Sequence, residues 1–245
     1  MAGHSKWKNI RLHKGKADVV RAKLFGKLSR DLTTAAKQGG DPDSNPRLRL
    51  AIDKAKAGSM PADNIKRAIQ KGTGELAADN FDEITYEGYG PNGVAVMVEA
   101  ATDNRNRTVA DIRSIFNKNG GSLGESGSVA WQFERKGQIT VASQNIDEDA
   151  LFEAALEAGA EDMQREGDDF QIQAAPESLS ALQIALEKAG FTVADLEVSL
   201  VPTTTIELEG DAAKKMLKLL DALEDYADVQ NVSANFEMSD AELSQ

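Results

Sequence analysis

Lysine and arginine side chains, the groups that bind phosphate, concentrate in the first 74 residues of the chain. That stretch holds 17 Lys and Arg against 6 Asp and Glu, a net charge of +11, whereas residues 75–245 hold 11 against 34, a net charge of −23. Cationic side chains neutralise nucleic-acid phosphates and release the counterions condensed on them. A solvated surface that only aids solubility is the alternative, but the asymmetry favours a polyanion-binding module on an acidic body.

The predicted nucleic-acid contacts form two groups, a basic arm and a set of helical positions. Residues 1–16 have no apolar periodicity, which indicates a mobile arm. Trp7 in this arm could stack on an exposed base, but anchoring of the arm on apolar surface is favoured. The arm contributes Lys6, Lys8, Arg11, Lys14 and Lys16, and the helices contribute Lys23, Lys27, Arg30, Lys37, Arg47, Arg49, Lys54, Lys66 and Arg67.

A second polar cluster spans Thr102–Thr108 and joins a predicted strand to a predicted helix. Arg105 and Arg107 stand near the N-terminus of that helix, where positive charge opposes the helix dipole. This unfavourable placement suggests a further contact with phosphate or with an acidic partner. The alternative is local: Asn and Asp side chains cap backbone amides, and the two arginines pair with nearby carboxylates. The sequence leaves both open.

The remaining residue types argue against enzyme chemistry. The chain has no cysteine, which excludes disulfides and zinc-thiolate sites. Its two histidines, His4 and His13, both lie in the basic arm, so a histidine-based triad is not expected. Carboxylates are plentiful, but no pair is isolated for acid–base work. The glycine-rich stretch Gly120–Gly127 lacks the lysine of a phosphate-binding loop and is predicted to be a mobile loop before an edge strand. We therefore expect no catalytic residue, metal, cofactor or small-molecule substrate.

Three helices are predicted to carry the helical cations. Leucines and alanines recur at helical spacing over residues 17–37, and Asn45 followed by Pro46 is typical of a helix start. The third helix begins at Pro61 and is closed by Gly72, and residues 74–80 form a linker. Three helices with short connections make a small bundle.

The rest of the chain alternates strands and helices. Residues 84–89 and 94–101 are predicted as a hairpin, and a capping-box pattern at Thr108–Asp111 predicts a helix start at Thr108. Residues 129–133 form a further strand. Residues 137–202 follow the order βαββαβ, which is typical of a ferredoxin-like unit. The tail has a short extended run, a helix and a strand, over residues 204–208, 211–223 and 229–236.

These elements predict an α+β multidomain fold. It consists of an N-terminal three-helix bundle followed by two ferredoxin-like α/β domains, one inserted in the other. No window is apolar enough to span a membrane, and no signal peptide precedes the bundle, so we expect a cytoplasmic protein. The predicted domains are residues 1–78 (arm and bundle), 79–136 with 203–245, and 137–202 (insertion).

Several motifs, in order along nearly the whole chain, resemble the YebC/PmpR family, which also contains the mitochondrial translational activator of cytochrome c oxidase subunit I. The opening Met1–Trp7 is similar to the hallmark start of that family. The other matching segments are Asn45–Arg49, Met60–Pro61 with Asn64–Ile65, Tyr86–Pro91, Thr102–Thr108, Gly127–Val129, Glu157–Asp162 and Val201–Pro202.

The resemblance implies a helical bundle with two α/β domains and a non-enzymatic role in gene expression. Some members are catalogued as DNA-binding transcriptional regulators, and others act in translation on the ribosome, including relief of stalling at proline-rich stretches. Phosphate contacts carry no base information, so charge alone does not separate DNA from ribosomal RNA. We predict a DNA-binding transcriptional regulator, with a ribosome-binding translation factor as the alternative.

Overall fold

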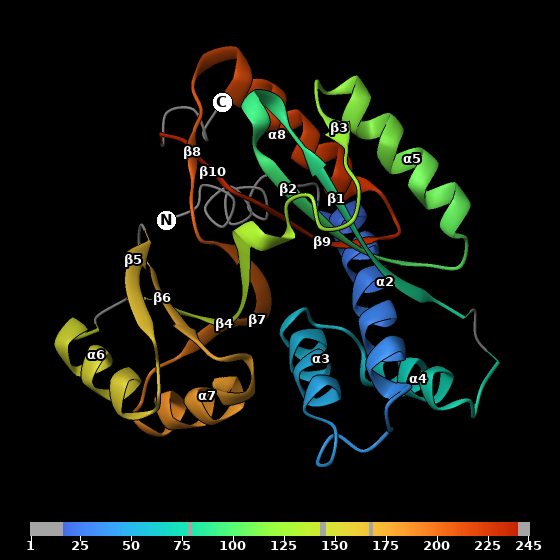
Figure 1. Cartoon of the computed structure of the whole chain (residues 1–245). Helices are drawn as coiled ribbons and strands as arrows, with labels where there is room; N and C mark the ends of the chain where they lie inside the picture. The colour runs from blue at the N-terminus through green and yellow to red at the C-terminus, as the bar shows by residue number, and fades with distance from the viewer. Residues whose placement is uncertain (1–16, 78–79, 143–145, 167–168, 240–245) are drawn as a thin grey trace.

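The computed structural model describes residues 17–77, 80–142, 146–166 and 169–239. It consists of a helical bundle, a central sheet with two helices, and a second sheet with two helices (Figure 1). The predicted α+β class and the order of bundle before strand-rich parts are confirmed. Within the described residues, no helix has the length and apolar character needed to cross a membrane.

The bundle contains the three predicted helices. Asn45 joins two of them: its side chain accepts a hydrogen bond from the Leu48 N–H (3.1 Å), and its amide donates to the carbonyl oxygens of Ala35 and Gly39 (both 2.8 Å). Asn45 thereby caps one helix and satisfies carbonyls at the end of the previous one. The helices are α2 (Ala17–Ala36), α3 (Pro46–Ala57) and α4 (Ala62–Thr73).

The end of α4 differs from the prediction. Gly72 was predicted to close this helix, but it lies inside α4, and Gly74 (φ +85°) is the C-terminal cap. A Cβ atom at Gly72 would lie 2.3 Å from the carbonyl oxygen of Thr33. Gly72 is therefore needed for the close approach of α4 to α2.

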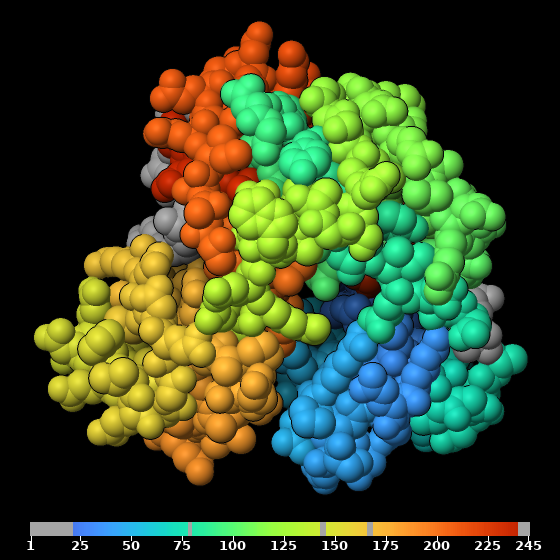
Figure 2. All heavy atoms as spheres, viewed as in Figure 1, coloured from blue at the N-terminus to red at the C-terminus, as the bar shows by residue number. Residues whose placement is uncertain are grey.

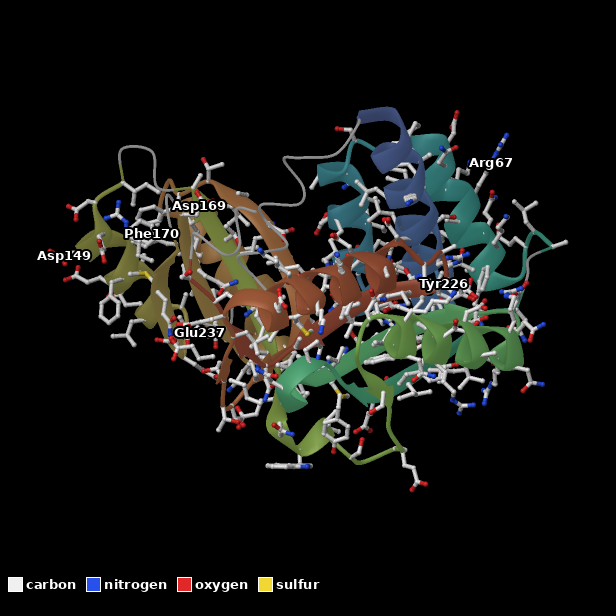
Figure 3. All side chains as sticks on the ribbon, turned by 90° about the horizontal axis from the view of Figure 1, so that it is seen from above. Arg67, Asp149, Asp169, Phe170, Tyr226 and Glu237 are labelled. Carbon is white, nitrogen blue, oxygen red and sulfur yellow. The ribbon has the colours of Figure 1, made fainter. Side chains whose placement is uncertain are left out.

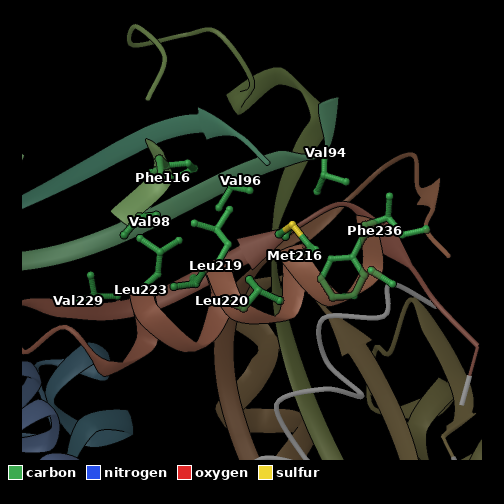
Figure 4. Packing of buried hydrophobic residues seen from close by; sticks show 14 of the residues in the cluster. Val94, Val96, Val98, Phe116, Met216, Leu219, Leu220, Leu223, Val229 and Phe236 are labelled. Atoms are coloured by element: carbon green, nitrogen blue, oxygen red, sulfur yellow. The ribbon is translucent and has the colours of Figure 1, made fainter. Parts of the chain in front are cut away.

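The central sheet has the strand order β3-β1-β2-β9. Strands β1 and β2 form the predicted hairpin, and β9 comes from the C-terminal tail to pair with β2. Figure 4 shows Met216, Leu219 and Leu223 of α8 facing Val96 and Val98 of β2 across the core. The elements are β1 (Asp82–Tyr89), β2 (Ala95–Thr102), α5 (Arg105–Lys118), β3 (Ser122–Leu123), α8 (Gly210–Asp225) and β9 (Val229–Ala234), with a small parallel pair, β8 (Ile206–Glu207) and β10 (Phe236–Glu237).

One predicted helix start and one predicted strand in this part are wrong. Helix α5 starts at Arg105 and not at Thr108, because Asn104 caps it by accepting from the Arg107 N–H (3.1 Å). The Thr108 hydroxyl is instead bound to Asp228 from the far end of the chain, so it does not cap a helix. The predicted strand 129–133 is a 3-10 turn, η2 (Ala130–Gln132), before the next strand.

The second sheet confirms the βαββαβ order of residues 137–202. Its strand order, β5-β6-β4-β7, is that of a ferredoxin-like unit. Strands β4 and β7 pair from Phe133 with Pro202 onward, so β4 runs across the predicted boundary at residue 137 while β7 ends at the predicted boundary at residue 202, and the exact division stays a prediction. The elements are β4 (Phe133–Ala142), α6 (Glu148–Glu157), β5 (Asp162–Glu166), β6 (Asp169–Ala174), α7 (Leu179–Lys188) and β7 (Val193–Pro202).

The bundle contacts both other parts. Leu50 of α3 packs against the hydrophobic core of the second sheet. Figure 2 shows the blue bundle and the yellow-to-orange second-sheet unit side by side below the central part. The bundle therefore has a fixed orientation, in which some of its faces are covered and others are open to solvent.

Two glycines in the bundle helices should respond to alanine in opposite directions. Gly72→Ala should lower the free energy of unfolding by about 1–3 kcal/mol, because its Cβ collides with the backbone of α2. Gly26→Ala should raise it by roughly 0.5–1 kcal/mol, because Gly26 is exposed inside α2 with no atom within 4 Å of the added Cβ. Urea unfolding measures both, and the same sign for the two variants would contradict this packing.

Candidate nucleic-acid interface

The cations Lys23, Lys27 and Arg30 form a basic stripe along α2, and this stripe faces the acidic body of the same chain. Its cations lie against carboxylates at the C-terminal end of α8 and just before β9. The C-terminus of a helix carries partial negative charge, which adds to the attraction. The pairs are Lys23 Nζ with Asp225 Oδ1 (3.0 Å), Lys27 Nζ with Glu224 Oε2 (3.8 Å) and Arg30 Nη2 with Asp228 Oδ1 (3.4 Å).

Asp228 is the hub of this contact. It is 5% exposed and accepts hydrogen bonds from the hydroxyls of Thr102 (3.1 Å) and Thr108 (2.8 Å). The Arg107 guanidinium donates to the same carboxylate (2.8 Å), opposite Arg30. Burial by itself would raise the pKa of Asp228, but the hydrogen bonds from Arg107, Thr108 and Thr102 outweigh it, so the pKa is lowered. Asp228 is therefore a buried, ionised carboxylate shared by the bundle and the central part.

Two further cations that were predicted to contact nucleic acid connect the bundle to β1 and to the residues just before it. Lys37 Nζ donates to Asn80 Oδ1 (2.9 Å) and to the carbonyl oxygen of Phe81 (2.7 Å). Arg47 donates through two nitrogens to the Glu83 carboxylate, the geometry of a strong guanidinium–carboxylate pair. Five of the nine predicted helical cations thus join the bundle to the acidic body.

Two other predicted cations interact within the bundle. Arg49 donates to the carbonyl oxygen of Pro42 (3.1 Å) and pairs with Asp43 (3.3 Å). Lys54 is half-buried near Asp31. Burial raises the pKa of Asp31, and Lys54 is the first of the neighbouring cations that partly offset this rise. Neither cation lies free on the surface.

The last two predicted helical cations, Lys66 and Arg67, are exposed on α4, together with Lys71. No ion pair to any of these three side chains exists among the described residues. Figure 3 shows Arg67 at the outer edge of the bundle, directed away from the rest of the chain. Lys71 was missed as a site residue, although its position four residues after Arg67 places the two on one helix face.

An open groove separates α3 from α4 beside these cations. Its apolar residues come from α4, and charged or amide groups stand at its edges. We call it the α3–α4 groove, and it is lined by Lys56, Ala62, Ile65, Lys66, Ile69, Gln70 and Glu75.

In the cluster Thr102–Thr108, both arginines pair with carboxylates of the same chain, which is one of the two alternatives that the sequence left open. Arg105 Nε donates to Asp82 (2.8 Å), and Arg107 pairs with Asp103 (2.7 Å) as well as Asp228. The hydrogen bond from Arg105 lowers the pKa of Asp82. Nucleic-acid contact by the two arginines stays a prediction, but their charges already face carboxylates of the same chain. The arm residues Lys6, Lys8, Arg11, Lys14, Lys16 and Trp7 lie outside the described residues.

The glycine-rich stretch was predicted as a mobile loop, and the structure anchors it instead. Glu87 is 7% exposed and accepts hydrogen bonds from the backbone N–H groups of Gly127 (2.6 Å), Val129 (2.8 Å) and Ala130 (2.9 Å). Burial would raise the pKa of Glu87, but these three amides outweigh it and lower the pKa. Strand β3 inside the stretch also pairs with β1, so its role is structural.

Comparisons with known proteins cover nearly the whole chain. Residues 5–75 match the family described as TACO1/YebC protein N-terminal domain, and residues 81–236 match TACO1/YebC second and third domain. A probable transcriptional regulatory protein of Pelotomaculum thermopropionicum is 55% identical over 243 residues, covering 98% of this chain and 100% of that protein. One of Geobacter sulfurreducens is 54% identical over 244 residues, covering 99% and 98%. The crystal structure of a conserved hypothetical protein, Aq1575, from Aquifex aeolicus has a TM-score of 0.85 and 47% identity, covering 92% and 93% of the two chains.

The role of Asp228 predicts a pH-dependent loss of stability. Asp228→Asn should lower the free energy of unfolding at pH 7 by about 2–3 kcal/mol, because Arg30 and Arg107 lose a buried counter-charge. The native pKa lies below the unfolded value of about 3.9, so this carboxylate stabilises the fold above that pH and loses its effect as the pH falls through the native pKa. In urea titrations the penalty should therefore stay constant from pH 7 to about pH 5 and shrink as the pH falls below about 4.

Asp225→Asn is the matched control. Asp225 is 52% exposed in its pair with Lys23, and such pairs contribute less than about 1 kcal/mol. Equal losses for the two variants at pH 7 would contradict the assignment of Asp228 as the hub.

Proposed function

This chain belongs to the TACO1/YebC family, and we propose that it is a non-enzymatic, nucleic-acid-binding regulator of transcription. The main support for nucleic-acid binding is the exposed basic face of α4. Its cations, Lys66, Arg67 and Lys71, form no ion pairs among the described residues. The relatives are named probable transcriptional regulatory proteins, which supports the regulatory part of the proposal.

The α4 face binds phosphate by charge. Arg67 and Lys71 are four residues apart and Lys66 is adjacent, so the three cations cover one side of a single helix. Each cation that neutralises a phosphate releases a condensed counterion. The five cations of residues 1–16 occur there without any Asp or Glu and add to this charge. The acidic body repels phosphate and thereby directs the nucleic acid to the bundle.

In this proposal, nucleic acid first contacts the α4 face and not the α2 stripe. Phosphate can reach Lys27 or Arg30 only by displacing a carboxylate of the same chain. An exchange of one anion for another gains little free energy, whereas contact with an unpaired, exposed cation needs no such exchange. Lys23, Lys27, Arg30, Lys37 and Arg47 thus orient the bundle and leave α4 facing solvent.

In vivo crosslinking followed by sequencing of the attached nucleic acid tests the regulatory role. We expect enrichment of promoter regions or of the transcripts made from them. Attachment confined to ribosomal RNA would overturn the transcriptional proposal in favour of a translation factor.

Neutralising the α4 face should weaken binding and flatten its salt dependence. The triple variant Lys66→Gln/Arg67→Gln/Lys71→Gln removes three cations, so the slope of log affinity against log salt should fall by up to about 3. The affinity for a DNA or RNA fragment should fall for every sequence, since phosphate contacts carry no base information. Fluorescence anisotropy titrations at several salt concentrations measure both quantities.

The control makes the same charge change on the acidic body. Lys214, Lys215 and Lys218 are exposed on α8, and Lys214→Gln/Lys215→Gln/Lys218→Gln removes three charges there. The control should leave the salt slope nearly unchanged. Equal effects of the two triple variants would mean that net charge, and not the α4 face, governs binding.

A further inference from the structure

The α3–α4 groove combines an apolar floor with a cationic rim. Ala62, Ile65 and Ile69 of α4 supply the apolar surface, while Lys56 and Lys66 stand at its edges. The Lys56 ammonium lies 3.8 Å from an Asp53 carboxylate oxygen, and the Lys56 side chain is 68% exposed, so its ammonium is accessible. The lining holds these two cations and one carboxylate, Glu75, beside the apolar residues, so it fits a ligand that has an apolar surface, a polar edge and negative charge near the cations.

The apolar surface continues beyond the groove. Leu76 follows α4, and its N–H donates to the carbonyl oxygen of Gln70 (3.1 Å), which holds it near the groove end. Its side chain is 42% exposed, which makes it one of a few large exposed apolar residues in the described chain. Polar groups stand at the same end, because the Gln70 amide donates to the Glu75 carboxylate (3.3 Å).

We propose that the α3–α4 groove binds an unpaired nucleobase, with the flanking phosphates on Lys56, Lys66 and Arg67. The proposal rests on the proposed nucleic-acid function and specifies the substrate class, a single-stranded segment. A nucleobase has flat apolar faces and a polar edge, and single-stranded nucleic acid can turn such a base out of its stack. The faces fit the surface of Ala62 and Ile69, and the edge meets the amide of Gln70 and the carboxylate of Glu75.

A nucleic-acid duplex does not offer the groove an unpaired base. Its bases are stacked and paired, so only phosphates reach the bundle and the apolar floor stays in contact with water. Binding of a duplex should therefore depend on the cations alone, and binding of a single strand on the cations and the groove together. A comparison of single-strand binding with duplex binding therefore distinguishes the contribution of the groove from that of the α4 cations.

Filling the groove without changing charge tests the proposal. Ala62 is exposed and is the first residue of α4, so Ala62→Phe occupies the groove without removing a core contact. The probes are fluorescein-labelled DNA and RNA single strands of about 12 nucleotides and the matching duplexes, titrated by anisotropy with the full chain. We expect single-strand affinity to fall about fivefold or more, because the apolar contact with the base is lost, with duplex affinity and both salt slopes unchanged. Comparison of the DNA and RNA strands identifies the preferred backbone.

Two controls keep the outcomes separable. Ala62→Ser leaves the groove open and should bind as the unmodified chain does, and Ala62→Leu replaces the phenylalanine variant if that variant does not fold. Unchanged single-strand affinity with a filled groove overturns the groove proposal, even when the Lys66/Arg67/Lys71 variant still loses binding. If the unmodified chain binds none of the probes, the proposed function and the groove proposal are both overturned. A protein partner would then be the expected ligand of the groove.

Discussion

The contact between the cations of α2 and the carboxylates around Asp228 determines how the whole molecule is arranged. Asp228 is buried, and a buried carboxylate remains ionised only when hydrogen-bond donors and cations surround it. The donors come from β2 and α5, and the second cation, Arg30, comes from the bundle. The bundle must therefore dock in one orientation, with α2 inward. This contact also joins the +11 and −23 portions of the chain, whose opposite charges attract.

The orientation separates the basic residues into two sets with different roles. Cations on α2 and Arg47 on α3 face the central part and compensate its negative charge. Arg67 on α4 faces away from it (Figure 3), Lys66 and Lys71 are exposed on the same helix, and the α3–α4 groove is lined in part by Lys66. In the proposed function, a phosphate that approaches the bundle meets the α4 cations, which form no ion pair among the described residues. The acidic body anchors α2, and in the proposed function it also acts as a repulsive surface that restricts where nucleic acid can bind.

Local patterns predicted most of the fold, because they depend on neighbouring residues. The three helices follow from apolar spacing and from Asn45 with Pro46, and the βαββαβ order follows from alternating strand and helix patterns. Long-range contacts were beyond such reasoning. Lys23 and Asp225 are 202 positions apart, so helical periodicity reveals a basic stripe but not the carboxylates that it meets. Thr108 matched a capping pattern, yet a tertiary partner, Asp228, takes its hydroxyl and Asn104 caps the helix.

The most direct test of this division of roles is lysine footprinting of the full chain with and without bound nucleic acid. Low-dose acetylation followed by mass spectrometry reports the accessibility of each ammonium group. We expect Lys66 and Lys71 to react readily in the free protein and to be protected by nucleic acid, while Lys27, 20% exposed against Glu224, reacts slowly in both states. Protection confined to Lys23 and Lys27, with Lys66 and Lys71 equally reactive in both states, would contradict it. That result would mean that the bundle leaves the acidic body to bind nucleic acid through α2.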